Sequence, residues 1–166
     1  MPVTPYWEIH ILPMFRLIDS DHMASFFNLL DYDQVVQNKD DIADSLTAKA
    51  MPPLSTGGPW PEEWVALYGR WVALNCPRLG SASNVKYTLA PRGSAMSLTA
   101  EGKYGDKEGA WFERLPDRGG VRVYALVVRP GGGNPTRPFK VEEKTIPAGT
   151  KSVTVQDKDG PHTVNA

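Results

Sequence analysis

The sequence predicts an α+β protein in two parts, a helical part over residues 1–80 and an antiparallel β-sandwich over residues 81–166. Two observations predict this division. Before residue 80, apolar residues recur at the three- and four-residue spacing of amphipathic helices. After it, short runs of alternating apolar and polar residues are interrupted by glycine and proline, a pattern typical of strands and turns. With 41% hydrophobic residues, the chain can bury a core in one domain or two small ones.

Two helical regions are expected before residue 50. The first is expected to begin at residues 19–21, where aspartate and serine suit an N-cap, and to continue through the apolar residues 26–30. The second is expected over residues 31–48, where Asp31 or Asp33 can cap it. The polar residues 38–41 are a candidate break that would divide it into two short helices.

The last helix has the clearest pattern. Pro61 suits the first turn, and Glu62 and Glu63 complement the positive end of the helix dipole. Apolar residues then follow at i, i+3, i+7 and i+10, which predicts one buried face. These residues are Trp64, Leu67, Trp71 and Leu74. Pro77 is expected to end the helix.

Seven strands are expected in the second part, separated by turn residues. Their ranges are 85–90, 95–102, 110–115, 121–129, 139–145, 151–157 and 161–165. The pairs at residues 119–120 (Gly-Gly) and 159–160 (Asp-Gly) predict tight turns. Both faces of the strand over 121–129 are apolar, which predicts a central strand buried on both sides. Seven short strands with frequent turns favour an antiparallel sandwich or small barrel.

Three short motifs in the first part occur in a recognisable order. Ile-Leu-Pro-Met-Phe lies at residues 11–15, Met-Pro at 51–52, and Trp-Val-Ala-Leu-Asn-Cys-Pro at 71–77. Through these motifs, residues 6–79 resemble a cytochrome-c-like helical domain. In that family such an opening precedes the haem motif, the Met-Pro pair supplies the second axial ligand, and a helix of this kind ends the domain. The resemblance implies a helical fold for this part and no redox activity.

The haem-attachment motif of that family is missing here. A c-type haem requires Cys-x-x-Cys-His, and the only cysteine is Cys76. In the resemblance, Asp19 and His22 take the places of the cysteines and Met23 that of the axial histidine. We therefore expect a haem-free unit without a cofactor. We expect its core to be filled by Trp60, Trp64 and Trp71, because an empty apolar cavity of haem size would be costly.

The bulk charge excludes an overall electrostatic drive toward nucleic acid or acidic membranes. Eighteen lysines and arginines stand against nineteen aspartates and glutamates, a net charge of −1. A single cysteine cannot form an internal disulfide, and neither a signal peptide nor a membrane span is recognisable. We expect a cytoplasmic protein, a monomer or homodimer, whose partner is another protein or a small-molecule ligand.

His22 is the most interesting single residue. With Asp21 it could perform acid/base catalysis, with Asp19 and Asp21 it could bind a metal, and opposite Met51 it could bind haem without a covalent bond. The alternative is that the aspartates are helix caps and His22 is a solvated residue of the first turn. A metal site needs three or four converging ligands, and this helix start offers at most two. We therefore expect no metal site.

Aromatic residues and carboxylates gather around residues 101–113. Glu108 with Tyr104 and Trp111 could hold a sugar, because aromatic rings and paired carboxylates suit carbohydrate. The alternative is a charged hairpin tip followed by a core tryptophan. Trp7 and Trp111 are also candidates for a surface contact with a partner. Cys76 is expected to be a small buried hydrophobe.

These observations favour a non-catalytic binding or accessory protein, because no complete catalytic constellation is present. It would hold a partner protein or a small ligand through the loops of the β-part or a groove between the parts. The alternatives are a cofactor-independent enzyme, acting on a small apolar or aromatic substrate by acid/base catalysis in an interdomain cleft, and a carbohydrate-binding module. A pocket holding His22 and a carboxylate would favour the enzyme, and a flat aromatic surface would favour the binding protein. Whether the protein is an enzyme stays open at this point.

Overall fold

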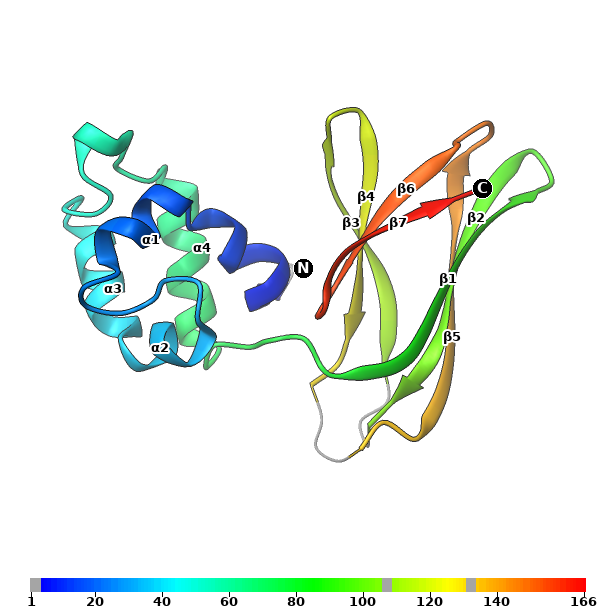
Figure 1. The fold of residues 1–166 in the computed structure, drawn as a ribbon, viewed down its shortest axis with the longest axis horizontal. Helices are drawn as coiled ribbons and strands as arrows, with labels where there is room; N and C mark the ends of the chain where they lie inside the picture. The colour runs from blue at the N-terminus through cyan, green and yellow to red at the C-terminus, as the bar shows by residue number, and fades with distance from the viewer. Residues whose placement is uncertain (1–3, 106–108, 131–133) are drawn as a thin grey trace. The chain divides into compact units, whose positions relative to one another are not determined.

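The computed structural model describes residues 4–105, 109–130 and 134–166. They form an α+β protein with two compact units, which we call the helical unit, Met1–Arg78, and the β unit, Leu79–Ala166 (Figure 1). The α+β class predicted from the sequence is confirmed. No helix among the described residues is long and apolar enough to cross a bilayer.

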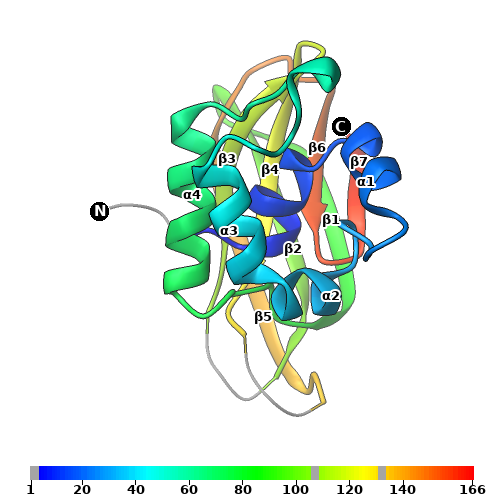
Figure 2. The same ribbon diagram turned by 90° about the vertical axis from the view of Figure 1, so that its left-hand side faces the viewer.

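The helical unit contains four α-helices in its described residues: α1 (Leu17–Met23), α2 (Tyr32–Gln37), α3 (Lys39–Thr47) and α4 (Glu62–Ala73). A π-helical turn at Trp7–Ile11 and a 3-10 turn at Leu12–Met14 precede them, and a second 3-10 turn at Leu54–Thr56 precedes α4. Helices α3 and α4 pack side by side (Figure 2).

Helix α2 begins where the sequence predicts. The side chain of Asp31 accepts a hydrogen bond from the backbone N–H of Gln34 at 2.9 Å, which satisfies one of the free donors of the first turn. The predicted break is also present, because Asn38 leaves the helical conformation between α2 and α3.

Helix α1 differs from the prediction at both ends. It begins at Leu17 and ends at Met23, so the expected start at residues 19–21 and the continuation to residue 30 are wrong. Asp19 is the third residue of the helix, where its carboxylate accepts from the backbone N–H of Arg16 at 3.1 Å. The negative charge of Asp19 stabilises the N-terminal turn of α1, although the residue lies within the helix and not before it. In the sequence, Asp19 therefore looks like a capping residue.

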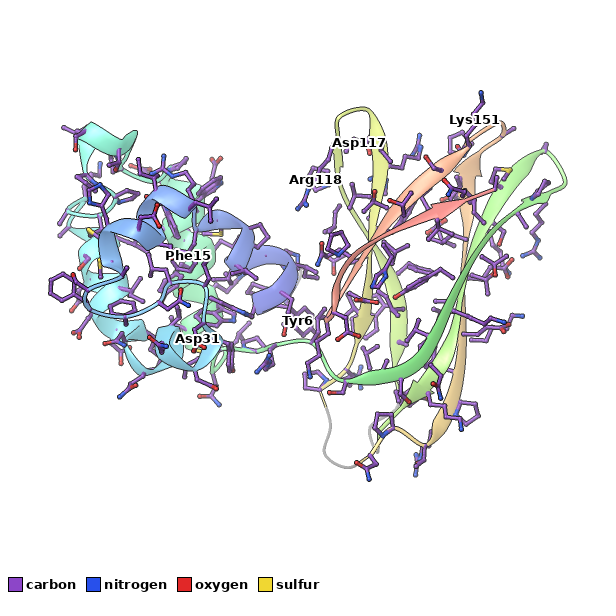
Figure 3. The ribbon with its side chains drawn as sticks, in the orientation of Figure 1. Tyr6, Phe15, Asp31, Asp117, Arg118 and Lys151 are labelled. Atoms are coloured by element: carbon purple, nitrogen blue, oxygen red, sulfur yellow. The ribbon has the colours of Figure 1, made fainter. Side chains whose placement is uncertain are left out.

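The core of the helical unit consists mainly of aromatic rings. Trp71 on α4 has no exposed surface, and its ring centroid lies 5.7 Å from that of Trp7 and 5.5 Å from that of Tyr68. Its indole N–H donates to the carbonyl oxygen of Pro77 at 2.9 Å. Phe15 lies inside the unit, 5.3 Å from Trp60 between ring centroids (Figure 3). The buried face of α4 therefore runs through Tyr68 and Trp71.

Of the predicted face of α4, Trp71 is buried, Trp64 and Leu67 are half-buried, and Leu74 is exposed. Leu74 is 50% exposed, because the helix ends at Ala73 and the chain turns away through Asn75 and Cys76, which both have left-handed backbone angles. The helix thus ends before Pro77, and its last expected apolar position falls in the turn.

The β unit contains seven strands in its described residues, in the predicted order. They are β1 (Ala82–Arg92), β2 (Ala95–Tyr104), β3 (Ala110–Arg118), β4 (Val121–Val128), β5 (Arg137–Pro147), β6 (Ser152–Asp157) and β7 (Gly160–Asn165). One sheet has the order β1-β2-β5, and the other has the order β3-β4-β6-β7 (Figure 1). The prediction of a wholly antiparallel unit is wrong at one pair, because β4 and β6 run parallel.

The two sheets share one core, to which β1 contributes Leu89, β2 contributes Leu98, β4 contributes Leu126 and β6 contributes Val155. Strand β4 is central in its sheet and buried from Val123 to Val128, so the expected burial on both faces is confirmed. The predicted turn at residues 119–120 joins β3 to β4, with both glycines in the left-handed region that side-chain-bearing residues rarely adopt.

Candidate functional site

A pocket of about 100 Å³ lies within the helical unit, between α1, α3 and the segment that leads to α4. Its surface is almost entirely apolar. Six of the apolar side chains that line it are Phe15, Met23, Leu29, Ile42, Leu46 and Trp60. A dry apolar cavity of about 150 Å³ can hold one benzene molecule. The pocket has about two-thirds of that volume, which limits its occupant to at most one aromatic ring or one branched aliphatic group.

The residues that line the pocket come from neighbouring elements, and on the helices their spacing places them on one face. Ile42 and Leu46 are four residues apart on α3, so they lie on one face, with Ser45 beside them. His22 and Met23 come from the last turn of α1. Met51, Pro52 and Pro53, from the segment between α3 and α4, complete this part of the lining.

The polar residues of the lining are Asp19, His22, Asp41 and Ser45. The carboxylate of Asp19 is occupied, because the Arg16 guanidinium donates to it at 2.7 and 2.9 Å. His22 and Asp41 are exposed and, within the part of the chain that the structure describes, have no hydrogen-bond or ion-pair partner. The pocket thus presents an apolar interior with an unpaired imidazole and an unpaired carboxylate at its edge.

Trp60 has the one buried side-chain polar atom without a hydrogen-bond partner among residues 4–105, 109–130 and 134–166. The residue is only 7% exposed and lines the pocket. Buried N–H groups are nearly always hydrogen-bonded, and a group left unpaired costs about 1–3 kcal/mol. The unpaired indole N–H of Trp60 is therefore a local cost to the stability of the helical unit.

Two of the residues that the resemblance assigns to haem ligation share this pocket. Met51 occupies the place of the distal ligand and Met23 that of the axial histidine, and both line it. The pocket does not fit a haem, however, because a macrocycle is several times larger than the single ring that about 100 Å³ accommodates.

Of the two residues proposed for acid/base catalysis, only one lines the pocket. His22 lines the pocket, whereas Asp21, the next residue toward the N-terminus on α1, is exposed and lies outside the lining. The carboxylates near His22 in the pocket are instead those of Asp19 and Asp41. No group of three or more histidine, cysteine, aspartate or glutamate side chains suited to a metal ion occurs among the described residues.

The residues proposed for binding in the β-part do not form one surface. Tyr104 packs against the shared core beside Phe139, with ring centroids 5.5 Å apart. Trp111 alternates along β3 with Phe112, which packs against that core, so Trp111 lies on the opposite face of its sheet. Glu108 lies outside the described residues. Tyr104 and Trp111 therefore do not provide a common platform for a sugar.

Trp7, proposed for a surface contact, is buried instead. It is 3% exposed and packs against Phe15 and Tyr32 in addition to Trp71. Four of the five residues of its π-helical turn are buried, Glu8 among them, so the turn offers little surface to a partner. The sequence did not predict this turn, because five residues are too few for a recognisable period.

Cys76 is a buried residue, as expected. Burial raises the pKa of its thiol above the ordinary value, which keeps it protonated and unreactive at neutral pH. Its carbonyl oxygen accepts a hydrogen bond from the Tyr32 hydroxyl at 2.7 Å, so this residue connects the end of α4 to α2.

A polar cluster in the β unit connects its two sheets. The hydroxyl of Tyr87 on β1 donates to one oxygen of Asp157 on β6 at 2.5 Å, and Nε2 of His162 on β7 lies 2.9 Å from the other oxygen. Burial and this hydrogen bond raise the pKa of Tyr87. The backbone N–H of Asp159 also donates to Asp157, so this carboxylate is fully engaged in holding β1 and the β6–β7 turn.

No protein-family model matches this chain, and neither a curated protein nor a solved structure matches it.

Proposed function

We propose that the protein is a non-catalytic binding protein and that the pocket of the helical unit receives one apolar group the size of a single ring. The observation that carries the proposal is the pocket itself, about 100 Å³ with an almost wholly apolar surface. The binding function is the one expected from the sequence, but the proposed site is a pocket of the helical unit instead of the loops of the β-part or a groove between the parts.

The expected affinity follows from the size of the pocket. A ring that buries roughly 150 Å² of apolar surface gains about 4 kcal/mol, which corresponds to a dissociation constant of about 1 mM. Binding of an isolated ring is therefore expected to be weak and measurable at millimolar concentration.

A second candidate is an enzyme that uses acid/base chemistry at the same pocket. It is favoured by one observation, which is that His22 and Asp41 line the pocket together. A catalytic imidazole is normally held by a third group, and His22 has no such partner in the described part of the chain. His22→Gln would abolish turnover without weakening ring binding if this second function operated.

For the fold, we propose that the helical unit is a haem-free relative of cytochrome-c-like domains and that the two sheets pack as a β-sandwich. Support for the first proposal is that Met23 and Met51, the two positions matched to axial ligands, line one pocket. Support for the second is that both sheets contribute to one core, with residues such as Leu98 and Leu126.

Fluorobenzene is a suitable probe for the pocket, because its fluorine resonance broadens and shifts when the ring is bound. The wild-type protein is expected to bind it with a dissociation constant near 1 mM. Ser45→Phe places a ring in the pocket from α3 and should abolish this binding. Thr47→Phe is the matched control, because Thr47 is exposed on the same helix and does not line the pocket. Equal binding by both variants, or no binding by the wild type, contradicts the proposal.

A further inference from the structure

The large apolar side chains that are exposed all belong to the helical unit, as far as the described residues go. They are Leu17, Ile18, Phe26, Leu30, Leu54 and Leu74. Four of them adjoin residues that line the pocket: Ile18 precedes Asp19, Phe26 precedes Phe27, Leu30 follows Leu29, and Leu54 follows Pro53. We call these four residues, Ile18, Phe26, Leu30 and Leu54, the pocket rim. Phe26 and Leu54 are 79% and 83% exposed, so most of each side chain contacts water. Large apolar side chains that are exposed on residues next in sequence to the lining of an apolar pocket are candidates for a protein-binding surface.

The helical unit is also strongly acidic, although the whole chain is nearly neutral. It contains ten aspartates and glutamates and five lysines and arginines, a net charge of −5, whereas the β unit has a net charge of +4. Three of its five cations are already paired within the unit. These pairs are Arg16–Asp19, Lys39–Asp40 and Arg78–Glu8. Most of the acidic charge is therefore free to attract a cationic partner.

Part of this free charge lies on the two helices that form the pocket. Asp21 on α1 and Asp41 and Asp44 on α3 are exposed, and the structure gives them no ion pair among the described residues. Asp41 itself lines the pocket. An apolar interior with an acidic edge is complementary to an apolar side chain flanked by lysine or arginine.

We infer that the pocket and its rim dock a basic, amphipathic segment of a partner protein, which inserts one aromatic or aliphatic side chain into the pocket. This inference rests on the proposed function, because the pocket must first accept an apolar group. A free small molecule would fill the pocket but leave the rim in water, whereas an amphipathic helix places further apolar residues one turn apart and can cover it. The anchor supplies affinity, and the acidic edge supplies orientation and partner selection.

The test uses the full chain and a fluorescein-labelled helical peptide with lysines on one face and one phenylalanine among small residues on the other. Replacing that phenylalanine by alanine should weaken binding at least tenfold, because it is the buried anchor. Replacing the lysines by glutamates should weaken it by a similar factor, and binding should decline with salt. Fluorobenzene should compete with the peptide, because both occupy the pocket.

Rim variants separate this surface from general adhesion. Phe26→Ser and Leu54→Ser remove exposed side chains, so they should leave folding intact and weaken binding of the peptide several-fold. Leu74→Ser is the matched control, because Leu74 is also an exposed leucine of this unit but lies outside the pocket lining and the rim. Equal weakening by all three variants overturns the inference.

The outcomes distinguish this inference from the proposed function. If fluorobenzene binds and the basic peptide does not, the pocket binds a ring but the docking inference is wrong. If neither binds, both are wrong. If the glutamate peptide binds as tightly as the lysine peptide, the acidic edge has no role and the inference is overturned. Sedimentation with phosphatidylserine vesicles that depends on Phe26 and Leu54 would overturn it in favour of a lipid surface, which an acidic unit is expected to avoid.

Discussion

Matched substitutions of Trp60 and Trp71 can measure how much the unpaired indole N–H of Trp60 affects the free energy of unfolding. Both are nearly or fully buried in the same aromatic core, with ring centroids that each lie within 6.4 Å of Tyr68. The indole N–H of Trp71 donates to the carbonyl oxygen of Pro77 at 2.9 Å, whereas that of Trp60 has no partner. Replacing either tryptophan by phenylalanine removes the same atoms, so the packing losses are similar and the hydrogen-bond effects are opposite.

The expected difference follows from these partners. Trp71→Phe loses one hydrogen bond, which is worth about 1 kcal/mol. The carbonyl of Pro77 keeps a second donor, the backbone N–H of Trp7 at 3.0 Å, so it is not left unpaired. Trp60→Phe removes a buried donor that costs at least about 1 kcal/mol, so this variant regains that amount. Trp71→Phe is therefore expected to be less stable than Trp60→Phe by about 2 kcal/mol.

The measurement is urea unfolding followed by circular dichroism at 222 nm, where the helices dominate the signal. Trp71→Ala serves as a reference for complete loss of the side chain and is expected to lose about 3–5 kcal/mol, because large-to-small changes in a core leave a cavity. A difference below about 0.5 kcal/mol between the two phenylalanine variants would show that the indole N–H of Trp60 is already satisfied.

Three further predictions concern caps and ionisation. Asp31→Ala should lower the free energy of unfolding by about 1 kcal/mol because it removes the cap of α2, whereas Asp31→Asn keeps an acceptor and should lose much less; urea unfolding compares them. Burial raises the pKa of both Cys76 and Tyr68, so the folded state favours their protonated forms. These two groups should therefore leave the free energy of unfolding unchanged below about pH 9 and lower it above that pH, because they ionise first in the unfolded chain. The decline should be smaller in Cys76→Ala. Unfolding curves between pH 8 and 11 test both expectations. A thiol reagent at pH 7.5 should label Cys76 in urea much faster than in the native protein, and equal rates would contradict its burial.

The strands were predictable because their signals are local. Alternation and turn residues locate a strand without knowledge of its neighbours, and the glycines at residues 119–120 adopt the backbone angles that such a turn requires. Which strands pair is a long-range property, and for this reason the parallel pairing of β4 with β6 could not be foreseen. Two strands far apart in sequence meet there because their apolar faces fit one core.

The candidate site was predictable only in part. His22 was singled out for its chemistry, and the structure places it at the pocket, but the pocket itself depends on side chains whose spacing also fits an ordinary core. Ile42 and Leu46 have the spacing of any buried helix face. Whether such a face is covered depends on the segment over residues 51–53, which has no regular pattern. A pocket exists where neighbouring side chains do not fill the space between them. The sequence pattern predicts which residues are buried, but not whether they fill that space.

The pocket is costly for a unit of this size, which makes a variant that fills it informative. An enclosed cavity of about 100 Å³ would cost about 2.4 kcal/mol at 24 cal/mol per Å³, and this pocket, which is partly open to solvent, costs less. A unit of 78 residues has a stability of roughly 4–12 kcal/mol, so the cost is a substantial fraction. Ser45→Leu fills part of the space from α3 and should raise the free energy of unfolding by about 1 kcal/mol while weakening fluorobenzene binding. Thr47→Leu, exposed on the same helix, should change neither. A pocket without function would give the same gain in stability, so the gain and the binding must be measured together: only a protein that binds the ring before the substitution and loses it afterwards shows that the space has a use.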